Sequence, residues 1–273
     1  MGKYDNVFIV SDIDNTFLAK DRSIPERNLD ALKYFKREGG RFTFATGRSH
    51  FSLHQAFPDA AELLNGPAIL GNGSYLYDYS REEIISPVYI EKALALQVTH
   101  FILDSYPDTG MRILTPETTI YSRINKYISK ELSQGWYKNI SLHQDPKDWS
   151  GIHWCKIVIR DDPEKLDDMR NLIDDKFSRN DIEMVKSEID FLEIQAKGCN
   201  KGRGIEILRD SCLKANKTTT FFACGDYEND ISMMKAADVA VCPNNACDEV
   251  KAIADLVLGE CDNGIIAELI EKL

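Results

Sequence analysis

A run of apolar residues that stops at two aspartates places the strongest constraint on this chain. Val7 to Val10 is an unbroken apolar stretch, and Asp12 and Asp14 follow it within four residues. Short apolar runs of this kind are typical of parallel strands that are buried on both faces. Ligands of open α/β sheets bind at the carboxyl ends of such strands. The segment therefore predicts an α/β fold that presents two carboxylates at the functional edge of a sheet.

Three further segments carry polar side chains at the ends of expected strands or just beyond them. Arg41 to Ala45 is expected to form a second buried strand, and Thr46-Gly47-Arg48 follows it. Lys201 lies in the glycine-rich segment 198–202. Thr219 to Cys224 is another apolar run, and it leads into Gly225-Asp226-Tyr227-Glu228-Asn229-Asp230. These segments come in the order that a single site around Asp12 and Asp14 needs.

With these motifs in place, the sequence resembles the haloacid dehalogenase (HAD) superfamily, and within it the Cof-type phosphatases of subfamily IIB. The family's motifs match Asp12-x-Asp14-x-Thr16, Thr46, Lys201 and Gly225-Asp226-x-x-Asn229-Asp230, and the resemblance covers nearly the whole chain. Asn15 departs from the pattern because glycine is frequent there, although asparagine also adopts left-handed backbone angles. The resemblance implies a doubly wound, Rossmann-like parallel sheet. It also implies a Mg²⁺-dependent phosphatase that hydrolyses a small phosphomonoester, a sugar phosphate or similar metabolite, through an aspartyl-phosphate.

The resemblance assigns the chemistry to Asp12 as nucleophile and to Asp14 as general acid and base. It implies metal ligands from the Asp12 carboxylate, the Asp14 backbone carbonyl and the Asp226 carboxylate, and hard oxygen ligands favour Mg²⁺ over Zn²⁺. These residue types suit the reaction, because a phosphomonoester is a dianion that a carboxylate attacks only when a cation and fixed donors neutralise the repulsion.

Further residues are implied to hold the transferring phosphoryl group. A hydroxyl would bind it by hydrogen bond and an ammonium as a point charge. Taken singly, Thr46 is more often a helix cap and Lys201 a solvated lysine, but their joint occurrence with both acidic motifs favours function. The implied phosphate-binding residues are Thr46, Gly47, Lys201 and Asn229, with Asp230 and Arg48 in support.

Two alternatives to a phosphatase remain open. A phosphomutase would return the phosphoryl group from the same aspartyl-phosphate to another hydroxyl of a sugar. A non-catalytic regulator would keep the phosphate pocket without turnover, but it would have no use for Asp12, Asp14, Lys201 and Asp226 together. The acid at position 14 favours turnover, because the ion-pumping relatives that hold their phosphoenzyme carry a threonine there.

The chain is expected to divide into a core, residues 1–86 and 198–273, and an inserted α+β domain, residues 87–197. The expected core elements are helices near 25–38, 202–213, 230–236 and 264–273 and strands near 68–70 and 239–241; the inserted elements are helices near 93–105, 125–134 and 163–177 and strands near 112–114, 119–121, 156–159, 182–185 and 191–194. The position of the insertion between the motifs of Thr46 and Lys201 matches the cap of subfamily IIB phosphatases, which implies that it selects the substrate.

Composition narrows the possible partners. The 273 residues are 43% hydrophobic with a formal charge of -11, which supports a packed core and argues against a nucleic-acid partner. No apolar stretch approaches the length of a membrane span, and the first residues lead into a strand rather than a signal peptide. Seven cysteines without a C-x-x-C pair fit a reducing compartment. We therefore expect a cytoplasmic monomer or weak homo-oligomer that acts on a small phosphorylated metabolite, not on nucleic acid or a membrane.

Other candidates carry weaker signals. His50 and His54 stand four apart on the helix expected after Thr46, but no third ligand accompanies them, which favours a partly exposed helical face. Cys199 is expected to be a small loop residue. The segment 198–204 lacks both the dinucleotide fingerprint and the P-loop consensus, which disfavours nicotinamide and ATP. The residues that could face a leaving group are Arg112, Arg123, Lys126, His153 and Trp154 of the insertion, although surface or packing roles are more frequent for each, together with Asn72 and Ser74 of a core loop.

Overall fold

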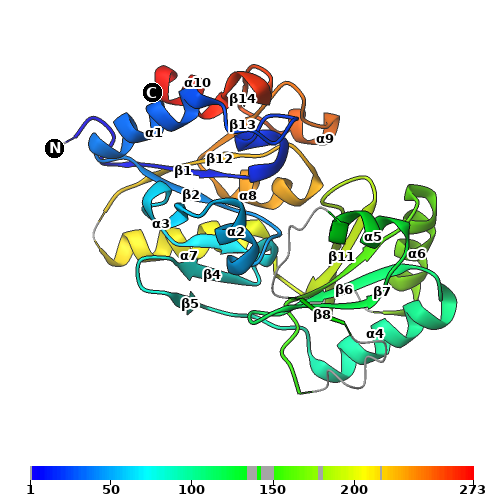
Figure 1. The fold of residues 1–273 in the computed structure, drawn as a ribbon. Helices are drawn as coiled ribbons and strands as arrows, with labels where there is room; N and C mark the ends of the chain where they lie inside the picture. The colour runs from blue at the N-terminus through cyan, green and yellow to red at the C-terminus, as the bar shows by residue number, and fades with distance from the viewer. Residues whose placement is uncertain (1, 134–139, 143–150, 178–180, 216) are drawn as a thin grey trace. The chain divides into compact units, whose positions relative to one another are not determined.

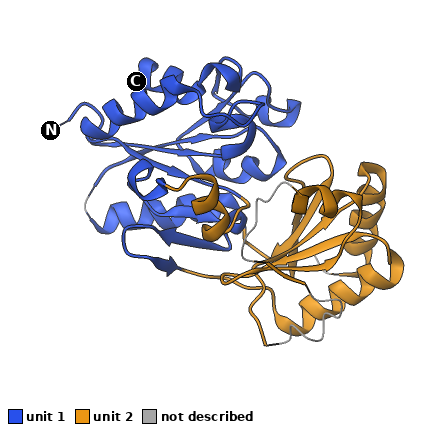
Figure 2. Cartoon of the chain, in the orientation of Figure 1, with its two compact units in different colours: residues 1–46, 59–85, 200–273 blue, residues 47–58, 86–199 orange. Residues whose placement is uncertain are grey.

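The computed structural model describes residues 2–133, 140–142, 151–177, 181–215 and 217–273 of the chain. The chain forms two compact units (Figure 2). The core unit comprises residues 1–46, 59–85 and 200–273, and the inserted unit comprises residues 47–58 and 86–199. Each unit contains a hydrophobic cluster of its own.

The core unit is built on a parallel sheet. Among the described residues, five strands pair in the order β14-β13-β12-β1-β2, all in parallel. Their bounds are β1 (Val7–Ser11), β2 (Arg41–Phe44), β12 (Thr220–Cys224), β13 (Val239–Cys242) and β14 (Leu256–Val257). A parallel bridge from Ala45 to Ile69 links β2 to an antiparallel sheet of β3 (Ala68–Leu70), β4 (Tyr75–Asp78) and β5 (Glu83–Ile85).

Helices cover both faces of the parallel sheet (Figure 1). On one face, α7 (Lys201–Lys214) and α8 (Ile231–Ala236) pack through Leu208 and Met233 in a cluster with Phe8 and Phe221 of the sheet. On the other face lie α1 (Glu26–Arg37) and α10 (Ile265–Lys272). Two short helices, α3 (Ala60–Leu63) and α9 (Asp248–Lys251), complete the unit. The predicted doubly wound α/β class is confirmed.

The inserted unit has a mainly antiparallel sheet. Within the described ranges its strands follow the order β10-β11-β9-β6-β7-β8, and only β7 and β8 pair in parallel. Alternation along β6 and β9 buries Ile113 and Ile157 in a cluster with residues of α4 and α6. The bounds are β6 (Gly110–Leu114), β7 (Thr119–Arg123), β8 (Ile140–Leu142), β9 (Lys156–Arg160), β10 (Ile182–Val185), β11 (Phe191–Ala196), α2 (His50–Ala56), α4 (Lys92–Ser105), α5 (Lys126–Ser133) and α6 (Pro163–Lys176).

The helices and strands expected from apolar periodicity are present in both units, and their ends differ from the expected ones by at most two residues. Gln134, the expected last residue of one helix, and Met1 lie outside the described residues. Strands β4, β5, β8 and β14 were not expected. Contacts place residues 47–58 with the inserted unit, whereas the expected core contained them; the role of the insertion as a cap stays a prediction. None of the described helices combines the length and apolar character needed to cross a membrane.

Candidate active site

The backbone after β1 forms a tight turn that carries the two aspartates. The Asp12 amide donates to the Cys224 carbonyl at 2.8 Å, which extends the pairing of β1 with β12 by one residue. A π-type turn follows at Ile13–Phe17, closed by the Leu18 amide and the Ile13 carbonyl at 2.8 Å. Asn15 adopts a left-handed conformation with φ 58°, which asparagine tolerates. Asp12 is thereby buried, whereas Asp14 is half-buried.

Lys201, the first residue of α7, joins two of the acidic motifs. Its ammonium donates hydrogen bonds to Oδ1 of Asp12 and to Oδ1 of Asp230, each at 2.6 Å. The helix start is fixed because the Asn200 side chain accepts from the Arg203 amide at 3.0 Å. Lys201 is 0% exposed, so it is not a solvated surface lysine, and a buried ammonium requires such pairing.

The loop after β12 arranges the other two carboxylates. Oδ2 of Asp230 accepts from the amides of Asp226 and Tyr227 at 2.9 and 3.2 Å. A Cβ atom at Gly225 would lie 2.3 Å from Cβ of Asp230, so only glycine permits this close approach. The Thr16 hydroxyl donates to Oδ1 of Asp226 at 2.8 Å, which connects the turn after β1 to this loop.

Burial controls the protonation of this cluster. Ligand atoms of Asp12, Asp226 and Asp230 lie within 4.8 Å of one another. Burial raises the pKa of Asp12 to about 7 against the opposing charge of Lys201, with Asp230 and Asp14 adding to the rise. Burial also raises the pKa of Asp226 well above its usual range, and Asp12 and Asp230 add to this effect. Burial alone would lower the pKa of Lys201, but the two carboxylates outweigh it and raise the pKa.

The donor set fits a hard divalent cation. Both oxygens of Asp230 are engaged by Lys201 and by backbone amides. Asp12 and Asp226 each have one oxygen engaged, and their second oxygens have no hydrogen-bond partner among the described residues. When all three carboxyls are ionised, their negative charge exceeds that of the one ammonium, and a cation with oxygen ligands would neutralise the excess. The unpartnered oxygens of Asp12 and Asp226 are therefore the better ligand candidates, and Asp230 is better suited to hold Lys201.

Thr46, Asn72 and Asn229 are connected at the end of β2. The Thr46 amide donates to the Ile69 carbonyl at 2.9 Å, and the Asn72 amide donates to the Thr46 carbonyl at 3.0 Å. Nδ2 of Asn229 lies 3.3 Å from Oδ1 of Asn72. Thr46 is 2% exposed. The loop around Asn72 therefore ties the second motif to the motif of Asp226.

The structure thus brings together Asp12, Lys201, Asp226 and Asp230 by direct contact, and Thr46 and Asn229 through Asn72. Gly47 and Arg48 follow Thr46 directly in the chain but group with the inserted unit. His50 is half-buried, and burial lowers its pKa to about 4.

The insertion residues considered as substrate contacts have other partners. Arg112 pairs with the buried Glu131 at 2.9 Å, and Trp154 lies in the hydrophobic cluster. Lys126 is exposed and pairs with Asp162 at 2.7 Å. The exposed ring of His153 stacks on Tyr89 at 4.6 Å. These contacts favour the packing and surface roles for the four residues.

Asn245 contacts the turn after β1, and the sequence analysis does not predict this contact. Its side chain donates to the carbonyl of Asn15 at 2.9 Å. The available signal was position, because Pro243-Asn244-Asn245 follows the apolar run of β13 at the same sheet edge as the acidic motifs.

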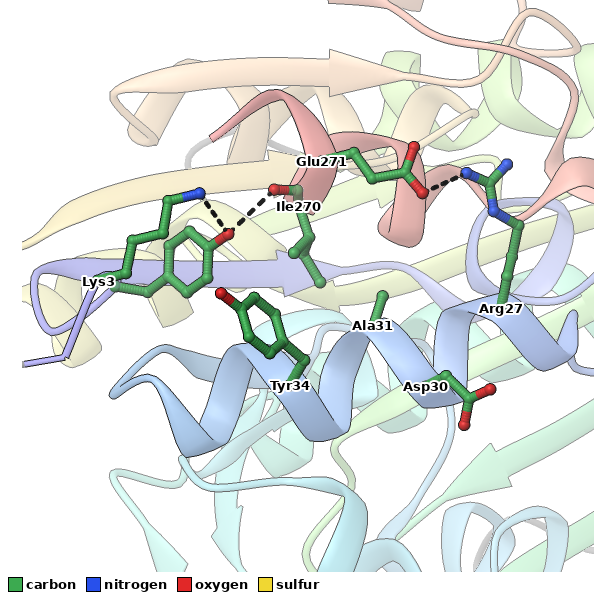
Figure 3. A pocket seen from close by; sticks show the side chains of 8 residues that line it. Lys3, Arg27, Asp30, Ala31, Tyr34, Ile270 and Glu271 are labelled. Atoms are coloured by element: carbon green, nitrogen blue, oxygen red, sulfur yellow. Dashed lines mark hydrogen bonds and ion pairs between the residues drawn. The ribbon is translucent and has the colours of Figure 1, made fainter.

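A pocket of about 360 Å³ in the core unit is lined by other residues (Figure 3). Its ionic side chains already have partners, since Lys3 donates to the Tyr4 hydroxyl at 2.8 Å and Arg27 pairs with Glu271 at 2.7 Å. None of the residues from the acidic motifs lines it. The lining residues are Lys3, Tyr4, Arg27, Asp30, Ala31, Tyr34, Ile270 and Glu271.

Comparison with known proteins identifies the family of this chain. Residues 9–270 match the family model described as haloacid dehalogenase-like hydrolase. The chain therefore belongs to the haloacid dehalogenase-like hydrolases, as predicted.

The relatives are consistent with this membership. The pyridoxal phosphate phosphatase YbhA of Escherichia coli (strain K12) is 27% identical over 270 residues, which cover 96% of each chain. The HMP-PP phosphatase of Klebsiella pneumoniae (strain 342) is 25% identical over 95% of this chain and 92% of its own. The solved structure of a HAD subclass IIB sugar phosphatase superposes with a TM-score of 0.79 at 22% identity, covering 97% of this chain and 98% of its own. The names of the two sequence relatives support the prediction of a phosphoric monoester hydrolase.

Proposed function

We propose that this protein is a Mg²⁺-dependent phosphatase that hydrolyses a small phosphomonoester through an aspartyl-phosphate on Asp12. The observation that carries the proposal is the buried contact of Lys201 with Asp12 and Asp230, directly beside Asp226. Such a cluster is costly to bury, and perturbed carboxylates of this kind are concentrated at functional sites. Membership of the hydrolase family supports the same assignment.

The carboxylates of Asp12 and Asp226 and the backbone carbonyl of Asp14 would hold Mg²⁺. When bound, the ion would neutralise charge on the phosphate and on the carboxylates. Both carboxylate oxygens of Asp230 already accept hydrogen bonds, so Asp230 is not among these metal ligands. It would instead hold Lys201 in place.

In the first step an oxygen of the Asp12 carboxylate attacks phosphorus and the bond from phosphorus to the leaving oxygen breaks. Asp14 gives its proton to that oxygen, and the free alcohol departs. In the second step Asp14 accepts a proton from water, the water oxygen bonds to phosphorus, and the bond between Asp12 and phosphorus breaks. Inorganic phosphate leaves, and both aspartates return to their starting states.

Fixed donors would hold the phosphoryl group through both steps. Lys201 supplies a positive charge, because its two carboxylate partners raise its pKa and keep the ammonium protonated. Thr46 and Gly47 at the end of β2 and Asn229 beside Asn72 would supply hydrogen bonds, with Arg48 in support. Lys201, Thr46 and Asn229 belong to one compact unit and would be in place before substrate arrives, so they would stabilise the transition state without reorganisation.

A phosphorylated metabolite of small size is the substrate class that the proposal names. The sequence relatives are named pyridoxal phosphate phosphatase and HMP-PP phosphatase, and a structural neighbour is named a sugar phosphatase. The inserted unit would act as the cap that selects among such metabolites. All seven cysteines are free thiols, which supports the expectation of a reducing, cytoplasmic compartment. For the assembly, we keep the expectation of a monomer or weak homo-oligomer.

The test is phosphate release from sugar phosphates, pyridoxal phosphate and nucleotides, with Mg²⁺ or with chelator. Asp12→Asn should lower turnover by at least about a thousandfold, because it removes the nucleophile. Asp30→Asn, a change at an exposed aspartate of α1, is the matched control and should keep full activity. Circular dichroism checks both folds. Wild-type turnover in Asp12→Asn would overturn the proposal, and isomerisation of a sugar phosphate without phosphate release would replace it with a mutase.

A further inference from the structure

The loop between β13 and α9 holds two parts of the proposed active site at once. Nδ2 of Asn245 donates to the carbonyl of Asn15 at 2.9 Å, and its Oδ1 accepts from the Cys261 amide at 2.9 Å. Two residues further on, the Cys247 amide donates to the carbonyl of Asp226 at 3.0 Å. One short loop therefore contacts both the turn that carries Asp14 and the loop that carries Asp226.

The turn needs support at Asn15 in particular. Ile13 is anchored by complete burial, and Thr16 by its hydrogen bond to Asp226 at 2.8 Å. Asn15, between them, is exposed and left-handed with φ 58°, a conformation that non-glycine residues adopt rarely. A hydrogen bond to its carbonyl fixes the orientation of the following peptide plane. Asn245 thus favours the single backbone conformation that the turn has here.

We propose that Asn245 is a positioning residue for Asp14. It holds the turn so that the Asp14 carboxyl meets the leaving oxygen of the substrate. This inference rests on the proposed function, in which the bond between Asp12 and phosphorus forms, the bond to the leaving oxygen breaks, and the proton of Asp14 passes to that oxygen. In this role Asn245 acts through the turn and not by contact with the reacting atoms.

The dependence on the leaving group separates this role from a merely structural one. An alkoxide needs protonation as it departs, whereas p-nitrophenolate is a weak base and needs little. A misplaced general acid therefore slows an alkyl ester more than an aryl ester, whereas general loss of structure slows both alike. The readout is the ratio of first-turnover rates for glycerol 2-phosphate and p-nitrophenyl phosphate, which excludes the later hydrolysis step that also uses Asp14.

Asn245→Ala should lower this ratio by about tenfold, a fraction of the contribution that a general acid makes. Asn245→Asp keeps the size of the side chain and an acceptor for Cys261, but places an oxygen against the Asn15 carbonyl, so it should lower the ratio too. Asn244→Ala changes the neighbouring residue, whose side chain donates to the half-buried Glu260 at 2.9 Å, and should leave the ratio unchanged. Thermal melting of each variant monitors the fold.

Asp14→Asn distinguishes failure of this inference from failure of the proposed function. If Asp14→Asn lowers the ratio and both Asn245 variants retain the wild-type ratio, the positioning role of Asn245 is overturned while the acid role of Asp14 stands. If Asp14→Asn slows both esters equally, the acid role fails and the inference fails with it. A lowered ratio in Asp14→Asn and in both Asn245 variants, with Asn244→Ala unchanged, supports the inference.

Discussion

The ammonium of Lys201 donates a 2.6 Å hydrogen bond to Oδ1 of Asp12, and the two side chains are 0% and 12% exposed. Each of these buried charges requires the other, because a buried charge without a partner of opposite sign would be strongly destabilising. The contact also directs the Asp12 carboxylate, since one oxygen is occupied by Lys201. The other oxygen has no hydrogen-bond partner among the described residues and is the one left for a metal ion.

Replacement of Lys201 by methionine should therefore affect both stability and activity. Lys201→Met leaves Asp12 and Asp230 buried without their cation, and we expect the free energy of unfolding at pH 8 to fall by about 3–5 kcal/mol. Urea denaturation measures this change, and phosphate release should be lost. Lys235→Met, at an exposed lysine of α8, should change stability by no more than about 0.5 kcal/mol. Similar losses in the two variants would contradict the burial argument.

The raised pKa of Asp12 predicts how stability depends on pH in the absence of metal. The folded protein binds this proton more tightly than the unfolded chain, because the pKa is raised from 3.8 to about 7. The stabilisation of the folded protein by this proton is thus fully present below pH 3.8. It is lost as the pH rises through 7, by up to about 1.4 kcal/mol per pH unit. The raised pKa of Asp226 acts in the same direction. Mg²⁺ competes with these protons, so its stabilising effect should be larger at pH 8 than at pH 5.

Melting temperatures with and without Mg²⁺ between pH 5 and pH 8 test this linkage. Asp12→Asn should flatten the pH dependence of the metal-free protein. His50, whose burial lowers its pKa to about 4, titrates in both proteins, so the difference between them reports Asp12 together with its effect on the pKa of Asp226. An increase in melting temperature with Mg²⁺ that is the same at pH 5 and pH 8 would show that protons and metal do not compete here.

The parallel sheet can be predicted from the sequence because the evidence for it lies in short, local segments. The apolar runs of β1, β2 and β12 are each bounded by polar residues, and the polar residues fall at one sheet edge by the geometry of parallel strands. The two residues of β14 and the hairpin of β4 and β5 carry too little periodicity to be recognised. The contact of Asn245 with Asn15 joins residues 230 apart, and no local pattern encodes such a pairing. The gathering of Asp12, Lys201, Asp226 and Asp230 is a structural finding, and their catalytic roles stay predictions.

Removal of the Thr16 hydroxyl should weaken the metal site, although Thr16 is not itself a proposed ligand. The hydroxyl donates to Oδ1 of Asp226 at 2.8 Å and lowers the pKa of that carboxyl against the effect of burial. Thr16→Val has nearly the same shape but no donor, so Asp226 should hold its proton to higher pH. We expect Mg²⁺ affinity at pH 7.5 to fall by about tenfold or more in isothermal titration calorimetry, as for other residues that support metal ligands. Thr16→Ser keeps the hydroxyl and should bind nearly as tightly as the wild type; a loss as large as that of Thr16→Val would mean that packing, not hydrogen bonding, matters here.

Gly73 should tolerate a side chain less well than Gly198, because two costs combine at Gly73. Its φ is 89°, and a Cβ atom would lie 1.9 Å from the backbone oxygen of Asn200, which caps the helix that begins at Lys201. Gly198 shares the left-handed conformation with φ 77°, but a Cβ atom there meets no atom within 4 Å. Gly198→Ala should therefore cost only the backbone term of about 1–2 kcal/mol, whereas Gly73→Ala should cost clearly more and should also displace Lys201. Because displacement by about 1 Å can cost a hundredfold in rate, phosphate release should fall sharply in Gly73→Ala and much less in Gly198→Ala. Equal losses of stability and activity in the two variants would mean that backbone strain alone, and not the contact with Asn200, sets the requirement for glycine at position 73.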